Sequence, residues 1–158
     1  MLLLILPLSL GLTLQLKAKQ HQDIIKVSNL QTDGDYQKQN NAVILLYVSA
    51  PECPYCKKLE KEVLTPLTKS NDYTDKVILR EITWRSSESI INFKGQADTP
   101  RNLLKSYDIK VTPTLLFLDA YGKELSPSIV GYSSNEFFWY YLDAAIRKSN
   151  IKLESTSK

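Results

Sequence analysis

The sequence has few of the side chains that bind metals or act as general bases: two cysteines, one histidine and one methionine in 158 residues. Zinc in a structural site takes four ligands, and no second cysteine pair follows Cys53 and Cys56. A cysteine hydrolase needs a histidine partner for its nucleophile, and His21 in the N-terminal segment is the sole candidate. We therefore expect neither a metal site nor a cysteine-hydrolase site.

A strong charge of one sign is also missing. The chain has 20 Lys and Arg against 17 Asp and Glu, and the two signs alternate instead of forming a basic block. Nothing in this pattern favours nucleic acid as a partner. Glycine and proline are scarce (5 and 7 residues), and 43% of the residues are hydrophobic, as in ordinary globular proteins. The length fits one domain with a hydrophobic core.

No apolar run is long enough for a membrane-spanning helix, which needs roughly 20 residues. The longest run, residues 2–16, is broken only by Ser9, Thr13 and Gln15 and suits the apolar core of a secretory signal. We interpret residues 1–18 as a signal peptide or N-terminal anchor, with a buried helix as the other reading. The protein is then expected to be exported, to the periplasm of a bacterium, and to touch the membrane only through this segment.

The remaining pattern predicts an α/β domain over residues 42–148, preceded by an N-terminal segment of the same fold at 19–41 and followed by a polar tail at 149–158. The expected strands are a short edge strand near residue 25, then 42–48, 77–84, 114–118 and a return strand from 123 that Pro127 interrupts. The expected helices are a weak one up to 41, one from Cys53 that Pro66 ends or kinks, 99–107, and 134–148 after a capping box at Ser133 and Glu136. Residues 85–98 look irregular. This order indicates a mixed central sheet flanked by helices.

The chemistry is expected at Cys53-Pro54-Tyr55-Cys56, which follows the buried strand 42–48 and begins a helix. The unpaired N–H groups and partial positive charge of a helix N-terminus favour thiolate over thiol. We therefore predict that Cys53 attacks disulfides and that Cys56, one turn later and deeper, resolves the mixed disulfide. Pro54 and Tyr55 lie between the sulfurs and are expected to tune the redox potential.

Two other uses of the cysteine pair remain open. A structural disulfide across two residues would close a tiny loop, and so would stabilise little. A carrier or chaperone could use Cys53 and Cys56 as soft ligands for Cu(I), although Met1 is the only methionine and no histidine is near.

The motif and its flanks resemble the thioredoxin superfamily, and more closely its exported bacterial members of the SoxW type. The likeness rests on the strand at 43–49, the Cys-Pro-Tyr-Cys motif with its helix, and the segment 107–117 containing Val-Thr-Pro-Thr. It implies a thioredoxin fold, a cis peptide bond between Thr112 and Pro113 beside Cys53, and client polypeptide pairing with the backbone of Thr112. It also makes residues 85–98 an insertion between the second core strand and the cis-proline segment, and implies no cofactor beyond the redox-active disulfide.

The sequence departs from the family at two places near the motif. Glu52 replaces the tryptophan that usually precedes the first cysteine, and Tyr47 stands about where the family has a buried aspartate. Another group would then take the proton of Cys56. Glu81 on the next strand is a candidate, with a plain solvent-facing residue as the alternative interpretation.

These observations together predict a thiol–disulfide oxidoreductase that reduces disulfides in exported proteins. Its partners would be exported clients and a membrane or periplasmic thiol protein that exchanges electrons with it. A disulfide-forming oxidase or an isomerase is the alternative within the same chemistry, and the non-catalytic Cu(I) or client-binding module is the alternative outside it.

Overall fold

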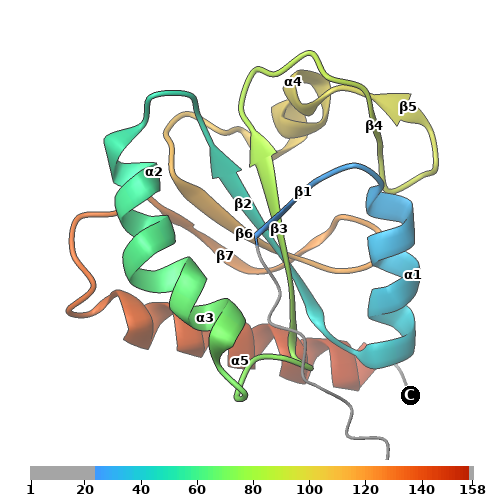
Figure 1. Ribbon diagram of the computed structural model, residues 1–158. Coiled ribbons are helices and arrows are strands. Elements are labelled where there is room, and N and C mark those ends of the chain that lie inside the picture. The colour runs from blue at the N-terminus through green and yellow to red at the C-terminus, as the bar shows by residue number, and fades with distance from the viewer. Residues whose placement is uncertain (1–23, 157–158) are drawn as a thin grey trace, which may run out of the picture.

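A five-stranded mixed sheet forms the centre of the protein (Figure 1). The computed structural model describes residues 24–156, so the predicted signal or anchor at 1–18 and His21 lie outside the described residues. The strands, in the order in which they lie across the sheet, are β1 (Ile25–Lys26), β3 (Val77–Thr83), β2 (Val43–Ser49), β6 (Thr114–Leu118) and β7 (Glu124–Val130). Strands β1, β2 and β3 are parallel, whereas β6 is antiparallel to both β2 and β7. The predicted fold class, a mixed sheet flanked by helices, is confirmed.

Strand β2 lies in the middle of the sheet, and all seven of its residues are buried. Because side chains alternate along a strand, its residues divide the core in two. Val43, Leu45 and Tyr47 join one apolar cluster, and Ile44, Leu46 and Val48 join the other. Helices cover both faces, which explains the continuous apolar run in the sequence.

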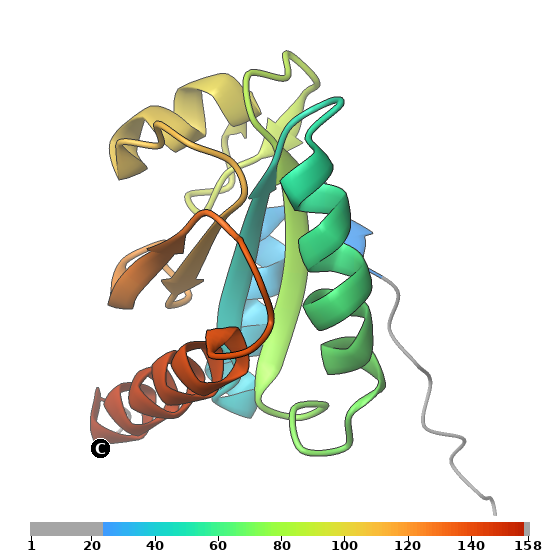
Figure 2. The ribbon, with the colours of Figure 1, turned by 90° about the vertical axis from the view of Figure 1, so that its left-hand side faces the viewer.

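The helices lie on the two faces as follows. The first cluster includes buried residues of α2 (Pro54–Leu59), α3 (Thr65–Lys69) and α5 (Phe138–Thr156). Helix α1 (Leu30–Asn40) contacts the other face through the ion pair of Asp33 with Arg80 of β3. Figures 1 and 2 show α2 and α3 on one side of the sheet and α5 running across its lower end. No helix within residues 24–156 is both long and apolar enough to cross a membrane.

Pro66 lies inside a continuous helical segment and does not end it. Between α2 and α3 the chain forms a π-helix, η1 (Glu60–Leu64), in which the N–H of Thr65 bonds to the carbonyl of Glu60. Proline has no N–H and its ring crowds the preceding turn of an α-helix. A wider turn directly before Pro66 makes room for it. Of the two predicted alternatives, an end of the helix at Pro66 is wrong, whereas a local departure from α-geometry occurs where it was expected.

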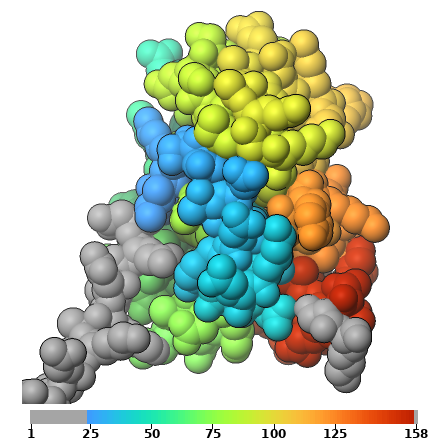
Figure 3. All heavy atoms as spheres, turned by 90° about the vertical axis from the view of Figure 1, so that its right-hand side faces the viewer, coloured from blue at the N-terminus to red at the C-terminus, as the bar shows by residue number. Residues whose placement is uncertain are grey.

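The insertion at 85–98 contains a small hairpin of β4 (Ile90–Ile91) and β5 (Ala97–Asp98). Strands of two residues are too short to produce a pattern of alternation, so the sequence predicted only irregular structure. The next segment is as predicted: Thr99 caps α4 (Pro100–Leu103), which continues as the 3₁₀ helix η2 (Leu104–Tyr107). In Figure 3 the hairpin and α4 form the upper part of the face above α1.

The C-terminal helix differs from the prediction at both ends. Helix α5 begins at Phe138, not near Ser134, and residues 133–137 form a loop instead of a capping box. The helix continues to Thr156, so the predicted polar tail at 149–158 is wrong for the residues up to 156. A polar residue lies in its buried stripe: the Ser149 hydroxyl lies 3.0 Å from the hydroxyl of Ser126 on β7.

Candidate active site

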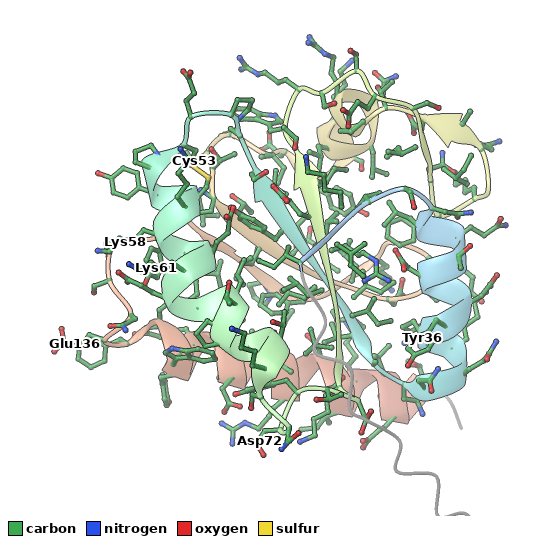
Figure 4. All side chains as sticks on the ribbon, in the orientation of Figure 1. Tyr36, Cys53, Lys58, Lys61, Asp72 and Glu136 are labelled. Carbon is green, nitrogen blue, oxygen red and sulfur yellow. A yellow bond between two sulfur atoms is a disulfide. The ribbon has the colours of Figure 1, made fainter. Side chains whose placement is uncertain are left out.

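The two cysteines form a disulfide at the start of α2 (Figure 4), at the end of the molecule where β2 and β3 terminate (Figure 1). After β2 the chain turns through Pro51 and Glu52, and Glu52 takes a positive φ of 55°. Cys53 then caps the helix with extended backbone, and Pro54 occupies its first turn, where a missing N–H does no harm. The local sequence thus places the first sulfur at the helix N-terminus.

The Cys53 sulfur has two hydrogen-bond donors near it. The backbone N–H of Cys56 lies 3.1 Å from Cys53 Sγ, and the hydroxyl of Thr112 lies 3.7 Å from the same atom. When the disulfide is reduced, these donors and the helix N-terminus favour a thiolate at Cys53.

The two sulfurs differ in access. Cys53 is half-buried, whereas Cys56 is 2% exposed and belongs to the core cluster. Pro54 and Tyr55 between them are exposed, Tyr55 to 57%. A disulfide of a client can therefore reach Cys53 but not Cys56.

The predicted substrate-binding pair lies directly beside the disulfide. The Thr112–Pro113 peptide bond is cis, Pro113 is buried, and its carbonyl accepts the N–H of Gly131 at 2.8 Å. This bond ties the segment before β6 to the end of β7, and so holds Thr112 facing Cys53. The structure thus brings together Cys53, Cys56, Thr112 and Pro113 from chain positions almost 60 residues apart.

A groove of about 550 Å³ adjoins this pair. Its walls are mainly apolar or aromatic and come from α2, the segment before β6, the end of β7, the loop after it and the start of α5; they include Tyr55, Val111, Ile129, Tyr132 and Phe138. Tyr132 and Phe138 form an edge-to-face pair with ring centroids 4.9 Å apart, which gives the floor of the groove a fixed shape.

Beneath α2, polar groups take the place of the family's buried aspartate. Tyr47 is completely buried, and its hydroxyl donates a 2.7 Å hydrogen bond to Glu60 Oε1. Burial, together with this carboxylate, raises the pKa of Tyr47 far above its usual value. Glu81 pairs with Tyr47 across the strands, is half-buried, and accepts a 2.6 Å hydrogen bond from Ser49.

Sequence reasoning missed Glu60. The signal was present, because Glu60 lies four residues after Cys56 and so on the same face of the helix. It was overlooked because charged residues alternate along this helix and none stands out.

Lys58 of α2 is bound away from the disulfide. Lys58 donates to the carbonyl of Ser133 at 2.8 Å and lies 5.8 Å from the centre of the Tyr132 ring. In Figure 4 both Lys58 and Lys61 extend from the outer side of the helix, below Cys53. In the part of the chain that the structure describes, no group of three or more His, Cys, Asp or Glu could hold a metal ion.

Comparison with known proteins agrees with this geometry. A family model described as a thioredoxin-like domain matches residues 30–146. The DsbH oxidoreductase has a similar structure, with 18% sequence identity, coverage of 87% of this chain and 94% of its own, and a TM-score of 0.57. A poplar thioredoxin h shares 18% identity over 75% of this chain and 96% of its own, with a TM-score of 0.51. A thioredoxin mutant from Halobacterium salinarum shares 18% over 78% and 91%, with a TM-score of 0.51. At these identities the structures show a common fold, and no curated protein matches the sequence.

Proposed function

Since the chain belongs to the thioredoxin-like domain family, we propose that this thiol–disulfide oxidoreductase works as a reductase of disulfides in exported proteins. One observation carries the proposal: a half-buried Cys53 at a helix N-terminus, bonded to a buried Cys56 and lying beside Thr112.

The reaction follows from the positions of the two sulfurs. The Cys53 thiolate attacks one sulfur of a client disulfide, forming a mixed disulfide and releasing the other client sulfur as a thiol. Cys56 then attacks Cys53 Sγ, so that the Cys53–Cys56 disulfide forms and the second client thiol leaves. Two electrons pass to the client, and a thiol protein partner restores the dithiol.

The surroundings of Thr112 suit an extended polypeptide. The backbone of Thr112 makes no hydrogen bond to another backbone group within residues 24–156, so its N–H and C=O can pair with a client strand. The adjacent groove would take an apolar side chain of the same client, against Tyr55 and Val111.

The direction of electron flow depends on how strongly the reduced form is stabilised. A strong oxidant of this chemistry owes its high potential to a stabilised thiolate. Here the two residues between the cysteines carry no charge, and Lys58 is bound to Ser133. Among residues 24–156, the hydrogen-bond donors to Cys53 Sγ are the N–H of Cys56 and the hydroxyl of Thr112, and no charged side chain bonds to this sulfur, which favours a reductase.

An exported location is part of the proposal. The support is the apolar segment 2–16 at the start of the chain, which is too short to span a bilayer and suits a signal or an anchor. The SoxW-type kinship, the exported clients and the thiol partner are predictions on the same basis.

Paired cysteine variants test the roles of the two sulfurs. Cys56→Ala should accumulate mixed disulfides with client proteins, because the attacking thiol remains and the resolving thiol is gone. Cys53→Ala is the matched control and should trap none. Equal trapping by both variants would contradict the assigned roles.

A redox titration against glutathione tests the direction. The potential should lie near that of thioredoxin, about −270 mV, and well below the roughly −120 mV of a strong oxidant. A potential of about −120 mV would contradict the reductase proposal and indicate a disulfide-forming oxidase instead. Stoichiometric copper without insulin reduction would instead favour the Cu(I)-binding alternative.

A further inference from the structure

The resolving step raises a problem that the cysteines alone do not solve. Cys56 must lose its proton to attack the mixed disulfide, yet it is 2% exposed and packed in the core. Burial disfavours the charged thiolate and limits the access of the water that would otherwise take the proton. An acceptor inside the protein is therefore needed.

The structure offers a carboxylate in the right place. Glu60 lies one helical turn after Cys56, and its backbone N–H bonds to the carbonyl of Cys56, so the regular four-residue spacing holds between them. Side chains at this spacing are neighbours, with about 5–6 Å between their β-carbons. Glu60 Oε1 accepts the hydroxyl of Tyr47, whereas no hydrogen bond to Oε2 is made by another of the described residues.

We propose that Glu60, positioned by the hydroxyl of Tyr47, accepts the proton that Cys56 releases when it resolves a mixed disulfide. Tyr47 is a positioning residue: it is completely buried, and its hydroxyl fixes the Glu60 carboxylate through the 2.7 Å hydrogen bond. The inference rests on the proposed disulfide-exchange function and names the group that makes its second step possible.

Other groups near the pair are less suited to the role. Tyr47 keeps its proton, because burial and the neighbouring carboxylate raise its pKa. Glu81 on β3 is the other carboxylate whose charge acts on Tyr47, but it already accepts a hydrogen bond from the Ser49 hydroxyl and lines a separate cleft together with Ser49, Ala50 and Pro51. On α2 and η1, Lys57 and Lys61 are exposed to solvent, and Glu62 is bound to Tyr132.

The proposed step balances. The proton moves from Cys56 Sγ to a Glu60 oxygen, and the Cys56 sulfur donates its electron pair to Cys53 Sγ. The bond from Cys53 to the client sulfur breaks, and the client sulfur leaves with that electron pair and is protonated by solvent. Glu60 then returns its proton to solvent, or to Cys56 when the partner reduces the disulfide.

A single-turnover experiment isolates this step. The reduced protein is mixed with an aromatic disulfide whose thiol product absorbs visible light. A first burst reports the attack of Cys53, and a second, slower burst reports the attack of Cys56 on the mixed disulfide. Both rates are followed from about pH 5 to about pH 9, because a general base affects a rate most in the pH range where the hydroxide concentration is low.

Three variants give distinct expectations. In Glu60→Gln the second burst should slow by about tenfold near neutral pH and approach the wild-type rate at the alkaline end, where hydroxide replaces the lost base. In Tyr47→Phe the carboxylate loses a hydrogen-bond donor, so the rise of the second burst with pH should move to higher pH. The first burst should be unchanged in both variants, which a merely structural defect would not allow.

The matched control is Glu62→Gln. Glu62 makes the same kind of bond two residues away, accepting the Tyr132 hydroxyl at 2.6 Å, but this tyrosine belongs to the loop before α5. Its second burst should match the wild type at every pH. A Glu60→Gln protein whose second burst stays within about twofold of the wild type throughout would overturn the inference. If the wild-type protein itself gives no bursts and does not reduce insulin, the proposed function fails instead.

Discussion

The ion pair between α1 and β3 allows a sharp prediction about stability. Arg80 donates to the Asp33 carboxylate through Nε at 2.9 and 3.0 Å and through a terminal nitrogen at 2.6 Å. The exposed fractions of the two side chains are 18% and 9%. Because both charges are largely removed from water, deleting one leaves the other buried and unpaired.

We therefore expect Asp33→Ala to lower the free energy of unfolding by about 3 kcal/mol, the lower end of the range for breaking a buried pair. The lower end applies because Arg80 keeps a 2.9 Å bond to the carbonyl of Leu79 and retains some contact with solvent. Such a loss is a large part of the roughly 5–15 kcal/mol that stabilises a domain. The measurement is urea unfolding followed by circular dichroism, with the disulfide kept oxidised.

The same helix contains a matched control. Asp35 pairs with Lys38 at 3.0 Å, but their exposed fractions are 58% and 45%. Asp35→Ala should therefore change the unfolding free energy by less than about 0.5 kcal/mol. Equal losses from the two alanine variants would refute the reasoning that burial decides the strength of the pair. Replacing Asp33 and Arg80 together with leucine and methionine should recover most of the loss, because no unpaired charge remains.

Three further predictions concern the groove, the packing of α1 and alkaline pH. Tyr55→Ala should raise KM for a peptide disulfide while leaving the rate with a small disulfide unchanged, since Tyr55 lines the groove and does not contact the sulfurs through any hydrogen bond among the described residues; an equal loss with both substrates would contradict this. Gly34→Ala should destabilise the protein by about 1–3 kcal/mol in thermal or urea unfolding, because its new β-carbon would clash with the backbone carbonyl oxygen of Ala120; unchanged stability would show that α1 can move away. Burial raises the pKa of Tyr107 from 10.0 to about 12, so the folded state favours the protonated phenol, and the stability it contributes should be present below pH 10 and lost as the pH rises through that window. Tyr107→Phe should reduce this alkaline loss, and an identical pH profile for the variant would exclude Tyr107 as its source.

The sequence was most informative where local chemistry and burial agree. The apolar run 42–48 indicated a strand covered on both faces, and Cys53 followed by Pro54 marks a helix start. The order of elements along the chain, the mixed sheet flanked by helices and the position of the cysteine pair could be predicted from these features and from the likeness to a known superfamily. Thr99 before Pro100 likewise signalled a cap that the structure contains.

The missed features depend on contacts between distant segments. The polar Ser149 suggested that the apolar face of helix α5 had ended. In the folded protein this serine is buried, and its hydroxyl is paired with that of Ser126 on β7. Pro66 predicted an end or a kink of the helix, but the wider π turn that accommodates it is a property of the folded helix and leaves no mark in the local pattern. The role of Glu60 could not be predicted, because it depends on a hydrogen bond from Tyr47. Tyr47 lies 13 residues earlier and contacts Glu60 only after the helix packs on the sheet.

The π-helix η1 also has a mechanical consequence. Two of its acidic residues reach in different directions: Glu60 to Tyr47 on the central strand and Glu62 to Tyr132 in the loop that walls the groove. The helical segment that begins with the cysteines is therefore hydrogen-bonded both to strand β2 of the sheet and to the loop between β7 and α5. Removing one residue from η1 would turn Glu60 and Glu62 away from their present directions, so that the hydrogen bonds to Tyr47 and Tyr132 could no longer form together.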